Sequence, residues 1–420
     1  MKAHLFALAA VGAFAAGAFE KIAFVDNFDF GMFFDLETAA GEEQVMRHAM
    51  ETGCDKIWWR VMSGAVPRYK SAEERVPSTV PPFDLLRLPL ASPGGWTHFE
   101  RMPEDLFGIF KRLSEKYGVG FGAHWTVEEA HWCDWSVGAW NLEHPQFWCR
   151  NEKGIPWPGK ASLAFPEVLA HKLRLVDEII ATGVETIYID TCRYSGWTPS
   201  REFVKPNIDR WRSLYGDAPL PLETARRDAR WLKIVAANEM RYLREIRKRL
   251  DRAVPRRRLA LGLEETGRSE ADGGDFMWHE RALDWRQLAA EGTVDDLVVI
   301  CVRIDKADPW RSARRVYDSV IAAKGRAKVY FPVRMYDFWN TSHGIPTFMK
   351  ASGLNAVVCG KRLLEMARDA GGDGIVMECV DYNNYPKELR EVIRTFGSEA
   401  AAPAGSADFS GENRGKSAKP

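Results

Sequence analysis

Two acidic residues stand near the ends of two apolar, β-rich segments. Asp190 ends the run IYID, and Glu264 follows LALGL. Side chains alternate between the two faces of a strand, so Leu259, Leu261 and Leu263 share one face and leave Glu264 on the other. The same rule separates Asp190 from the isoleucines of its own strand. Both carboxylates are therefore predicted to point away from the apolar side of their strands, toward a common interior.

Two carboxylates that point into one interior, at the same end of their strands, are what glycoside hydrolysis requires. One carboxylate attacks the sugar or activates water, while a protonated carboxyl group assists the leaving oxygen. We assign Asp190 as the nucleophile or base and Glu264 as the general acid, with Glu378 as the alternative acid. The opposing hypothesis is a buried salt-bridge network, in which these acids neutralise the arginines at the strand ends, namely Arg60, Arg193, Arg303 and Arg334.

The elements that must hold these residues alternate regularly. Segments with helical periodicity separate eight β-rich segments, and several of the helical segments end at Gly immediately before the next strand. Eight units, without a Gly-rich phosphate motif after the first strand, favour an α/β fold with a single (β/α)8 TIM barrel over a doubly wound sheet. The predicted strands are 21–30, 56–62, 118–127, 185–194, 258–267, 296–305, 328–337 and 374–383.

Active sites of such barrels lie at the C-terminal ends of the strands and on the loops that follow. Polar and aromatic residues are abundant at these positions. A long loop over about 128–165 adds five tryptophans, and indole rings stack on the apolar faces of sugars. The alternative for these tryptophans is a small core of their own. The predicted substrate-binding residues are Asp26, Arg60, His124, Trp125, Trp132, Trp135, Arg193, Tyr194, Glu265 and Arg334.

No cofactor or metal is expected. The stretch HWTVEEAHW, over 124–132, groups two histidines with two glutamates but lacks the spacing of a zinc site, so His124 is assigned to hydrogen bonding with substrate. The arginines at the strand ends form a separate clue. If at least two of them are not paired with protein carboxylates, we expect the carbohydrate substrate to carry a carboxylate or sulfate, because the guanidinium group binds such anions bidentately. The alternative is that all of them form internal ion pairs.

The segments WNLEHPQFWCRNEKGIPW and LAFPEVLAHKLRLVDEIIATGVETIYIDTCRY resemble glycosyl hydrolase-like barrel proteins of the family-10-type glycosylhydrolase group. The resemblance covers about residues 120–200. It implies a TIM barrel, carbohydrate hydrolysis, and Asp190 as the central carboxylate. The chain lacks both a second acidic residue after Asp190 and an Asn-Glu pair in that strand, so the acid must come from another strand. The matching positions are His144, Pro145, Gly154, Pro166, Glu167, Val168, Gly183, Asp190, Arg193 and Tyr194.

The rest of the chain sets the context of this domain. Lys plus Arg and Asp plus Glu number 58 each, so nothing indicates binding to nucleic acid or to an acidic membrane. Residues 1–18 predict a signal peptide and hence a secreted or periplasmic protein, with the barrel over 19–398 and a disordered tail over 399–420. No stable membrane insertion is expected. Of seven cysteines, Cys133 and Cys149 lie in one loop and would be able to pair in an exported protein.

Two other classes of function stay open at this point. One is a glycan-binding barrel that keeps the aromatic cleft without a working pair of carboxylates. The other is a metal-dependent sugar isomerase or lyase that uses His124, Glu264 and Glu378. The sequence leaves the glycan, its linkage, the stereochemical outcome and the oligomeric state open.

Overall fold

The chain is described from a computed structural model. The predicted signal peptide and C-terminal tail lie outside the described residues, so both stay predictions. The residues described are 19–25, 38–63, 66–75, 102–126, 138–191, 198–266, 276–305, 307–335, 344–378 and 385–397.

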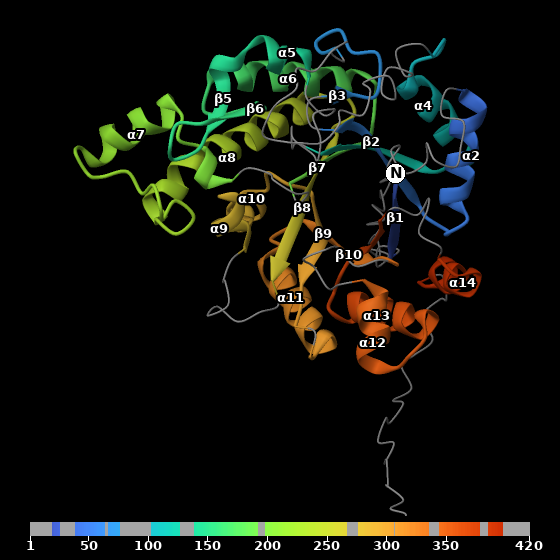
Figure 1. Cartoon of the computed structure of the whole chain (residues 1–420). Helices are drawn as coiled ribbons and strands as arrows, with labels where there is room; N and C mark the ends of the chain where they lie inside the picture. Colours follow the sequence, from blue (N-terminus) through green and yellow to red (C-terminus); the bar gives the residue numbers. More distant parts are fainter. Residues whose placement is uncertain are drawn as a thin grey trace, which may run out of the picture.

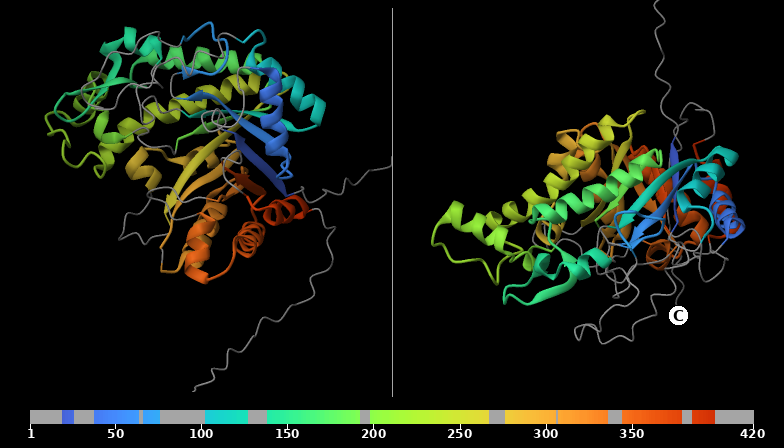
Figure 2. Two further views of the ribbon diagram at one scale, coloured as in Figure 1. Left: turned by 45° about the vertical axis from the view of Figure 1, so that its right-hand side comes forward. Right: turned by 90° about the horizontal axis from the view of Figure 1, so that it is seen from above.

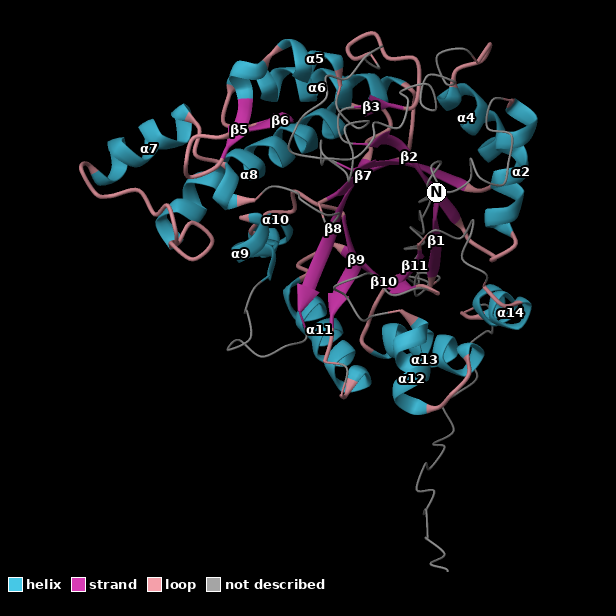
Figure 3. Ribbon diagram, viewed as in Figure 1, coloured by secondary structure: helices cyan, strands magenta, loops and turns pink. Residues whose placement is uncertain are grey.

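Eight parallel strands close into a barrel (Figure 3). The ring closes because β1 pairs with both β2 and β11. Each of the eight predicted segments overlaps one of these strands, which confirms the predicted (β/α)8 barrel. The strands are β1 (Glu20–Val25), β2 (Lys56–Ser63), β4 (Gly120–Thr126), β7 (Thr186–Asp190), β8 (Arg258–Thr266), β9 (Asp296–Arg303), β10 (Lys328–Val333) and β11 (Gly374–Met377).

Helices surround the strands and cover their outer faces (Figure 1). The helix α4 ends at Gly118, whose φ of 66° is the left-handed conformation that glycine adopts at helix C-termini. In the described part of the chain, no helix has the length and apolarity needed to cross a bilayer. The helices between successive strands include α2 (Ala39–Met50), α4 (Leu106–Tyr117), α6 (Pro166–Ala181), α8 (Ala229–Arg252), α9 (Phe276–Arg281), α10 (Trp285–Ala290), α11 (Pro309–Ala323), α12 (Ile345–Ser352) and α13 (Ala356–Asp369), and α14 (Lys387–Thr395) follows β11.

Two insertions extend one side of the barrel (Figure 2). The described part of the tryptophan-rich segment is not a plain loop. It contains α5 (Ala139–Glu143), a 3₁₀ turn at Pro145–Phe147, and the hairpin of β5 (Trp148–Arg150) and β6 (Pro156–Ala161). The helix α7 (Lys205–Tyr215) follows β7 and packs against α8. A two-residue strand, β3 (Val66–Pro67), pairs antiparallel with β2 outside the ring.

The barrel interior is a separate apolar cluster that is rich in aromatic rings. Residues on the opposite parity of the same strands belong to the larger core under the helices. Tyr188 and Ala260 lie inside, and Ile187 and Leu261 lie outside, as the alternation of side chains predicts. The interior cluster consists of Ile22, Phe24, Trp58, Tyr188, Ala260, Val298, Ile300, Tyr330 and Val376.

Glycines in two strands make room for these rings. A Cβ atom on Gly122 would overlap the indole of Trp58, and one on Gly262 would lie 2.6 Å from the Tyr188 hydroxyl oxygen. Large and small side chains therefore alternate across the interior, because eight strands enclose only enough space for a filled core.

We expect Gly122→Ala to lower the free energy of unfolding by about 1–3 kcal/mol, because overpacking a filled interior displaces Trp58 from its position. Urea denaturation measures the loss. The control is Gly108→Ala on α4, where the nearest atoms are 3.5 Å away on the flexible Glu104 side chain. That variant should be neutral or slightly more stable, since Ala favours helix more than Gly does. Equal stability of both variants would show that the interior has spare volume beside Trp58.

At the N-terminal end of the barrel, the Glu20 carboxylate joins three strands. It accepts hydrogen bonds from Lys328 and from the Tyr330 hydroxyl (2.9 Å), and it lies 2.8 Å from Lys56 Nζ. Burial disfavours the charge on Glu20, but the hydrogen bonds from Lys328, Lys56 and Tyr330 outweigh burial and lower its pKa from 4.5 to about 2. This end of a barrel contributes to stability rather than to the chemistry of the active site.

We expect Glu20→Gln to lower the free energy of unfolding at pH 7 by about 3 kcal/mol. Because the folded pKa is depressed, this stabilisation is fully present above the unfolded pKa of 4.5 and is lost as the pH falls toward 2. Chemical denaturation of wild type and variant between pH 7 and pH 2.5 should therefore show converging stabilities. Glu185→Gln is the control, since its half-exposed carboxylate lies 3.9 Å from Lys56. A difference that does not change with pH would contradict the assignment.

Candidate active site

Above the apolar interior, six polar side chains form a layer at the C-terminal ends of the strands. We call this set the polar layer: Arg60, His124, Asp190, Glu264, Arg334 and Glu378. None is more than 3% exposed. Their neighbours along the strands, such as Ile189, Leu263 and Val333, belong to the outer core. Alternation therefore directs the polar layer toward the barrel axis, which is where barrel enzymes keep their catalytic groups.

Asp190 and His124 form a buried pair on the neighbouring strands β7 and β4. His124 Nε2 lies 3.1 Å from Asp190 Oδ2, and Thr126 Oγ1 lies 3.4 Å from the same nitrogen. The imidazole rests on the aromatic interior, with ring centroids 5.1 Å from Phe24 and 4.8 Å from Tyr188. This support fixes the ring and presents Asp190 at a defined position. Sequence reasoning selected both residues but did not predict their contact.

Glu264 on β8 contacts a cation that sequence reasoning missed. Arg281 Nη2 donates to Glu264 Oε2 at 3.2 Å, and both side chains are buried. Arg281 is the last residue of α9, and the next residue, Ala282, has a φ of 51°. This left-handed residue ends the short helix where its last side chain meets β8. No strand pattern marks Arg281, because it lies 17 residues after Glu264.

Glu378 and Arg334 make a third buried contact, between β11 and β10. Arg334 Nη1 lies 3.3 Å from Glu378 Oε2 and 3.1 Å from the Ile300 carbonyl oxygen on β9. Arg334 thus takes part in an internal ion pair, the alternative considered for the arginines at the strand ends. Arg60 pairs in register with His124, and its side chain is 1% exposed.

Two of the predicted binding residues lie on the other side of their strands. Trp125 is fully buried in the outer core, where its ring meets Tyr242 of α8 edge-on at 6.3 Å. Glu265 accepts a hydrogen bond from Trp285 Nε1 of α10 at 2.6 Å. Both side chains belong to the packing between strands and helices, so the structure does not bring them to the polar layer.

The remaining predicted residues are not placed. Asp26, Trp132, Trp135, Arg193 and Tyr194 lie outside the described residues. Each belongs to a segment that follows a barrel strand in the sequence, so their assignment to substrate binding stays a prediction.

Two of the three described tryptophans of the insertion pack locally, and the third, Trp157, lies under the Arg201 guanidinium. Trp140 stacks on His144 and His171, each at 4.3 Å, and Trp148 Nε1 donates to the Asn141 carbonyl oxygen at 2.7 Å. These rings build a small core, which was the alternative to a sugar-binding role. Cys149 lies beside them as a thiol that donates to Glu202 Oε1 at 3.2 Å, while Cys133 lies outside the described residues.

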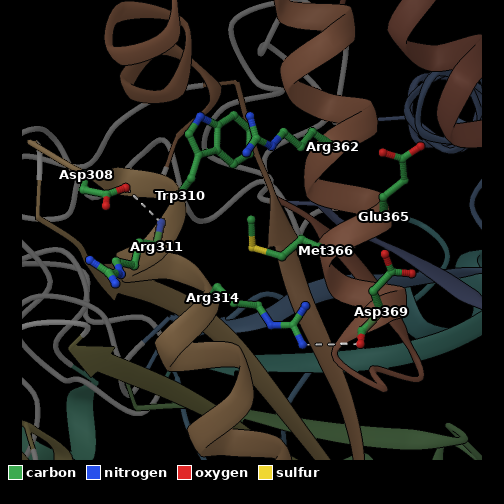
Figure 4. A pocket seen from close by; sticks show the side chains of 8 residues that line it. All are labelled: Asp308, Trp310, Arg311, Arg314, Arg362, Glu365, Met366 and Asp369. Carbon is green, nitrogen blue, oxygen red and sulfur yellow. Dashed lines mark hydrogen bonds between the residues drawn. The ribbon is translucent and has the colours of Figure 1, made fainter. Parts of the chain in front are cut away.

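Within the described part of the chain, no three His, Cys, Asp or Glu side chains group closely enough to hold a metal ion. A cavity of about 540 Å³ lies on the outer surface between α11 and α13 (Figure 4). Three arginines and three acids line it, including Arg314 and Asp369, so its charges balance. None of the residues that line it belongs to the polar layer.

Solved structures with the same barrel are similar to this chain at low sequence identity. The glycoside hydrolase domain of PgaB (BpsB) from Bordetella bronchiseptica matches with a TM-score of 0.57 and 11% identity, over 89% of this chain and 99% of that one. The catalytic domain of β-amylase from Paenibacillus polymyxa matches with a TM-score of 0.58 and 10% identity, over 92% and 100%. The chain shares their barrel fold.

A β-galactosidase from Bacillus circulans sp. alkalophilus also matches, with a TM-score of 0.54 and 12% identity, over 91% of this chain and 56% of that one. No protein-family model matches the chain, and no curated protein sequence does. The family-10-type resemblance therefore stays a hypothesis, and at these identities the similarity of structure concerns the fold.

Proposed function

We propose that this protein is a glycoside hydrolase that cleaves a poly- or oligosaccharide with two carboxylates of the polar layer. Asp190 is the nucleophile or the base that activates water, and Glu264 is the general acid. The single observation that carries the proposal is the position of both carboxylates on the inner face of adjacent strands, at the end of the barrel where catalysis occurs in this fold.

The spacing of the two residues supports a shared substrate. Asp190 is one residue beyond Ile189, whose partner is Leu261, and Glu264 is three residues beyond Leu261. Neighbouring strands lie about 4.8 Å apart and rise about 3.3 Å per residue, so the two Cα atoms are roughly 8 Å apart. Side chains from these positions are able to reach opposite sides of one glycosidic bond. Carboxyl groups about 5–5.5 Å apart would give retention, and about 6.5–9.5 Å inversion.

His124 positions the nucleophile in this proposal. It contacts Asp190 directly and is itself held by Phe24 and Tyr188. Arg281 plays the same part for Glu264. The aromatic side chains Trp132 and Trp135 would line the subsites, and secretion through the predicted signal peptide would bring the enzyme to extracellular glycans.

A second candidate function is supported by the contacts of the acids. Asp190, Glu264 and Glu378 each lie beside a basic side chain, as in a stable buried network. A glycan-binding barrel without turnover would have this arrangement.

A hydrolysis screen separates the two candidates. The full chain is incubated with neutral and anionic polysaccharides, new reducing ends are measured, and binding to the same glycans is followed by affinity electrophoresis. Release of reducing ends, lost in an Asp190→Asn/Glu264→Gln double variant, supports the hydrolase. Binding without release of reducing ends from any bound glycan supports the binding barrel.

A further inference from the structure

A second groove lies outside the barrel, between α7 and the first half of α8. It encloses about 500 Å³, within the range of small-molecule sites. Ala164, which follows β6, also lines the groove. We call it the α7–α8 groove. The residues that matter for its chemistry are Asn207, Arg210, Tyr215, Lys233, Asn238 and Arg241.

The α7–α8 groove carries an uncompensated positive charge. Arg210, Lys233 and Arg241 line it, and no lining residue is acidic. Nearby arginines on the same helix are paired, for example Arg230 with Asp228 at 2.7 Å. The three cations of the groove have no carboxylate within 4 Å in the described part of the chain, although Arg241 donates to the Leu163 carbonyl oxygen at 3.1 Å. In a chain with equal numbers of acidic and basic residues, this accumulation favours an anionic ligand.

Two asparagines form an ordered polar wall in the groove. Asn207 Nδ2 donates to the Glu202 carbonyl oxygen at 2.9 Å and to Glu202 Oε2 at 3.2 Å. Its amide oxygen therefore faces Asn238, whose Nδ2 donates to it at 2.9 Å and to the Ile234 carbonyl oxygen at 3.4 Å. Both N–H groups of Asn238 are used, and its Oδ1 accepts no hydrogen bond from the described residues.

The buried base of this wall keeps the amides in one orientation. Glu202 is 4% exposed and also accepts a hydrogen bond from Ser162 Oγ at 2.5 Å. Burial raises the pKa of Glu202, although hydrogen bonds from Ser162 and Cys149 act in the opposite direction. Because Glu202 fixes Asn207 and Asn207 fixes Asn238, the free amide oxygen is preorganised to accept from a ligand hydroxyl.

The remaining wall is apolar. Leu214 is 49% exposed, and the ring of Tyr215 beside it is supported by Trp211 at a centroid distance of 4.8 Å. An aromatic ring of this kind contacts the apolar face of a sugar. The groove thus combines cations for an anionic group, an amide oxygen for a hydroxyl group, and an aromatic ring for the apolar face of a sugar.

We propose that the α7–α8 groove binds the anionic portion of a polysaccharide, a sugar ring that carries a carboxylate or a sulfate ester. Arg210 and Lys233 bind the anion, Asn238 Oδ1 accepts from a ring hydroxyl, and Tyr215 contacts the ring. Binding there requires no turnover in the barrel, so the proposal goes beyond the hydrolase function. The cavity between α11 and α13 does not share these properties, since Asp308, Glu365 and Asp369 balance its arginines.

The test measures binding of three oligosaccharides to the full chain by calorimetry: oligogalacturonate, sulfated dextran oligosaccharide and neutral dextran oligosaccharide of equal length. The measurements use an Asp190→Asn background, which prevents cleavage. We expect one of the two anionic ligands to bind at least tenfold more tightly than dextran, and its identity distinguishes carboxylate from sulfate. Arg210→Ala/Lys233→Ala should weaken that binding at least tenfold, and Asn238→Leu should weaken it several-fold.

Matched variants separate the site from general charge effects. Lys233→Arg keeps the cation and should retain binding, and Arg314→Ala removes a cation from the other cavity and should leave binding unchanged. The proposal is overturned if neither anionic ligand binds, if Arg210→Ala/Lys233→Ala binds as tightly as the parent, or if Arg314→Ala weakens binding equally. Equal affinity for a DNA oligonucleotide of the same charge would also overturn it, because the groove would then select charge alone.

Discussion

Asp190→Asn is expected to lower kcat/KM on a hydrolysed glycan by roughly 10³- to 10⁶-fold, the range for loss of a catalytic nucleophile or base. An amide neither attacks the sugar nor accepts a proton from water. Asparagine has the size of aspartate and keeps a hydrogen-bonding group opposite His124 Nε2, 3.1 Å away in the wild type. The variant should therefore fold normally. Initial rates of reducing-end release measure the loss, and thermal unfolding checks the fold.

Asp318→Asn is the matched control, because it makes the same change on the exposed surface of α11. It should retain full activity. A variant of His124 adds a second check. If His124 positions Asp190, His124→Gln should lower kcat and leave KM nearly unchanged, whereas loss of a direct hydrogen bond to substrate would also raise KM. Full activity of Asp190→Asn would remove this carboxylate from the chemistry and leave Glu264 and Glu378 as the remaining pair of acids.

Alternation of side chains along strands was sufficient to place much of the candidate site. The pattern of Leu259, Leu261 and Leu263 predicted that Glu264 faces the interior, and the structure places those leucines in the outer core. Side chains alternate with a period of two residues because the strand backbone is extended, so this pattern is visible in the sequence. The same rule directs Glu265 outward, where it contacts Trp285, and so disagrees with the assignment of Glu265 to substrate binding.

Alternation does not predict which side chains of neighbouring elements contact each other. Arg281 reaches Glu264 from the end of a short helix, and His124 reaches Asp190 from the adjacent strand. These pairs depend on strand order and on where a loop places its side chains, neither of which has a short sequence period. Trp125 illustrates the opposite error, because an aromatic residue at a strand end was assigned to sugar although its parity directs it toward α8.

The role of Glu264 as general acid can be tested by changing the leaving group of the substrate. A general acid is needed most when the leaving group is a poor one, such as a sugar hydroxyl, and least when the leaving group is already stable as an anion. We therefore expect Glu264→Gln to lower kcat/KM on the natural glycan about 10²- to 10⁴-fold, while kcat/KM for an aryl glycoside with a dinitrophenolate leaving group stays close to the wild-type value. Asp190→Asn, in contrast, should be slow on both substrates.

Glu378→Gln tests the alternative acid with the same two substrates. Because Glu378 contacts Arg334 rather than Arg281, the two glutamates occupy separate positions around the axis, and only one of them is able to protonate the leaving oxygen. Glu388→Gln, an exposed change on α14, is the control that should keep wild-type rates on both substrates. If the dependence on leaving group appears in Glu378→Gln and not in Glu264→Gln, the acid lies on β11. Glu264 would then be a partner of Arg281 that holds α9 against the barrel, and the pair of carboxylates would span β7 and β11 instead of two adjacent strands.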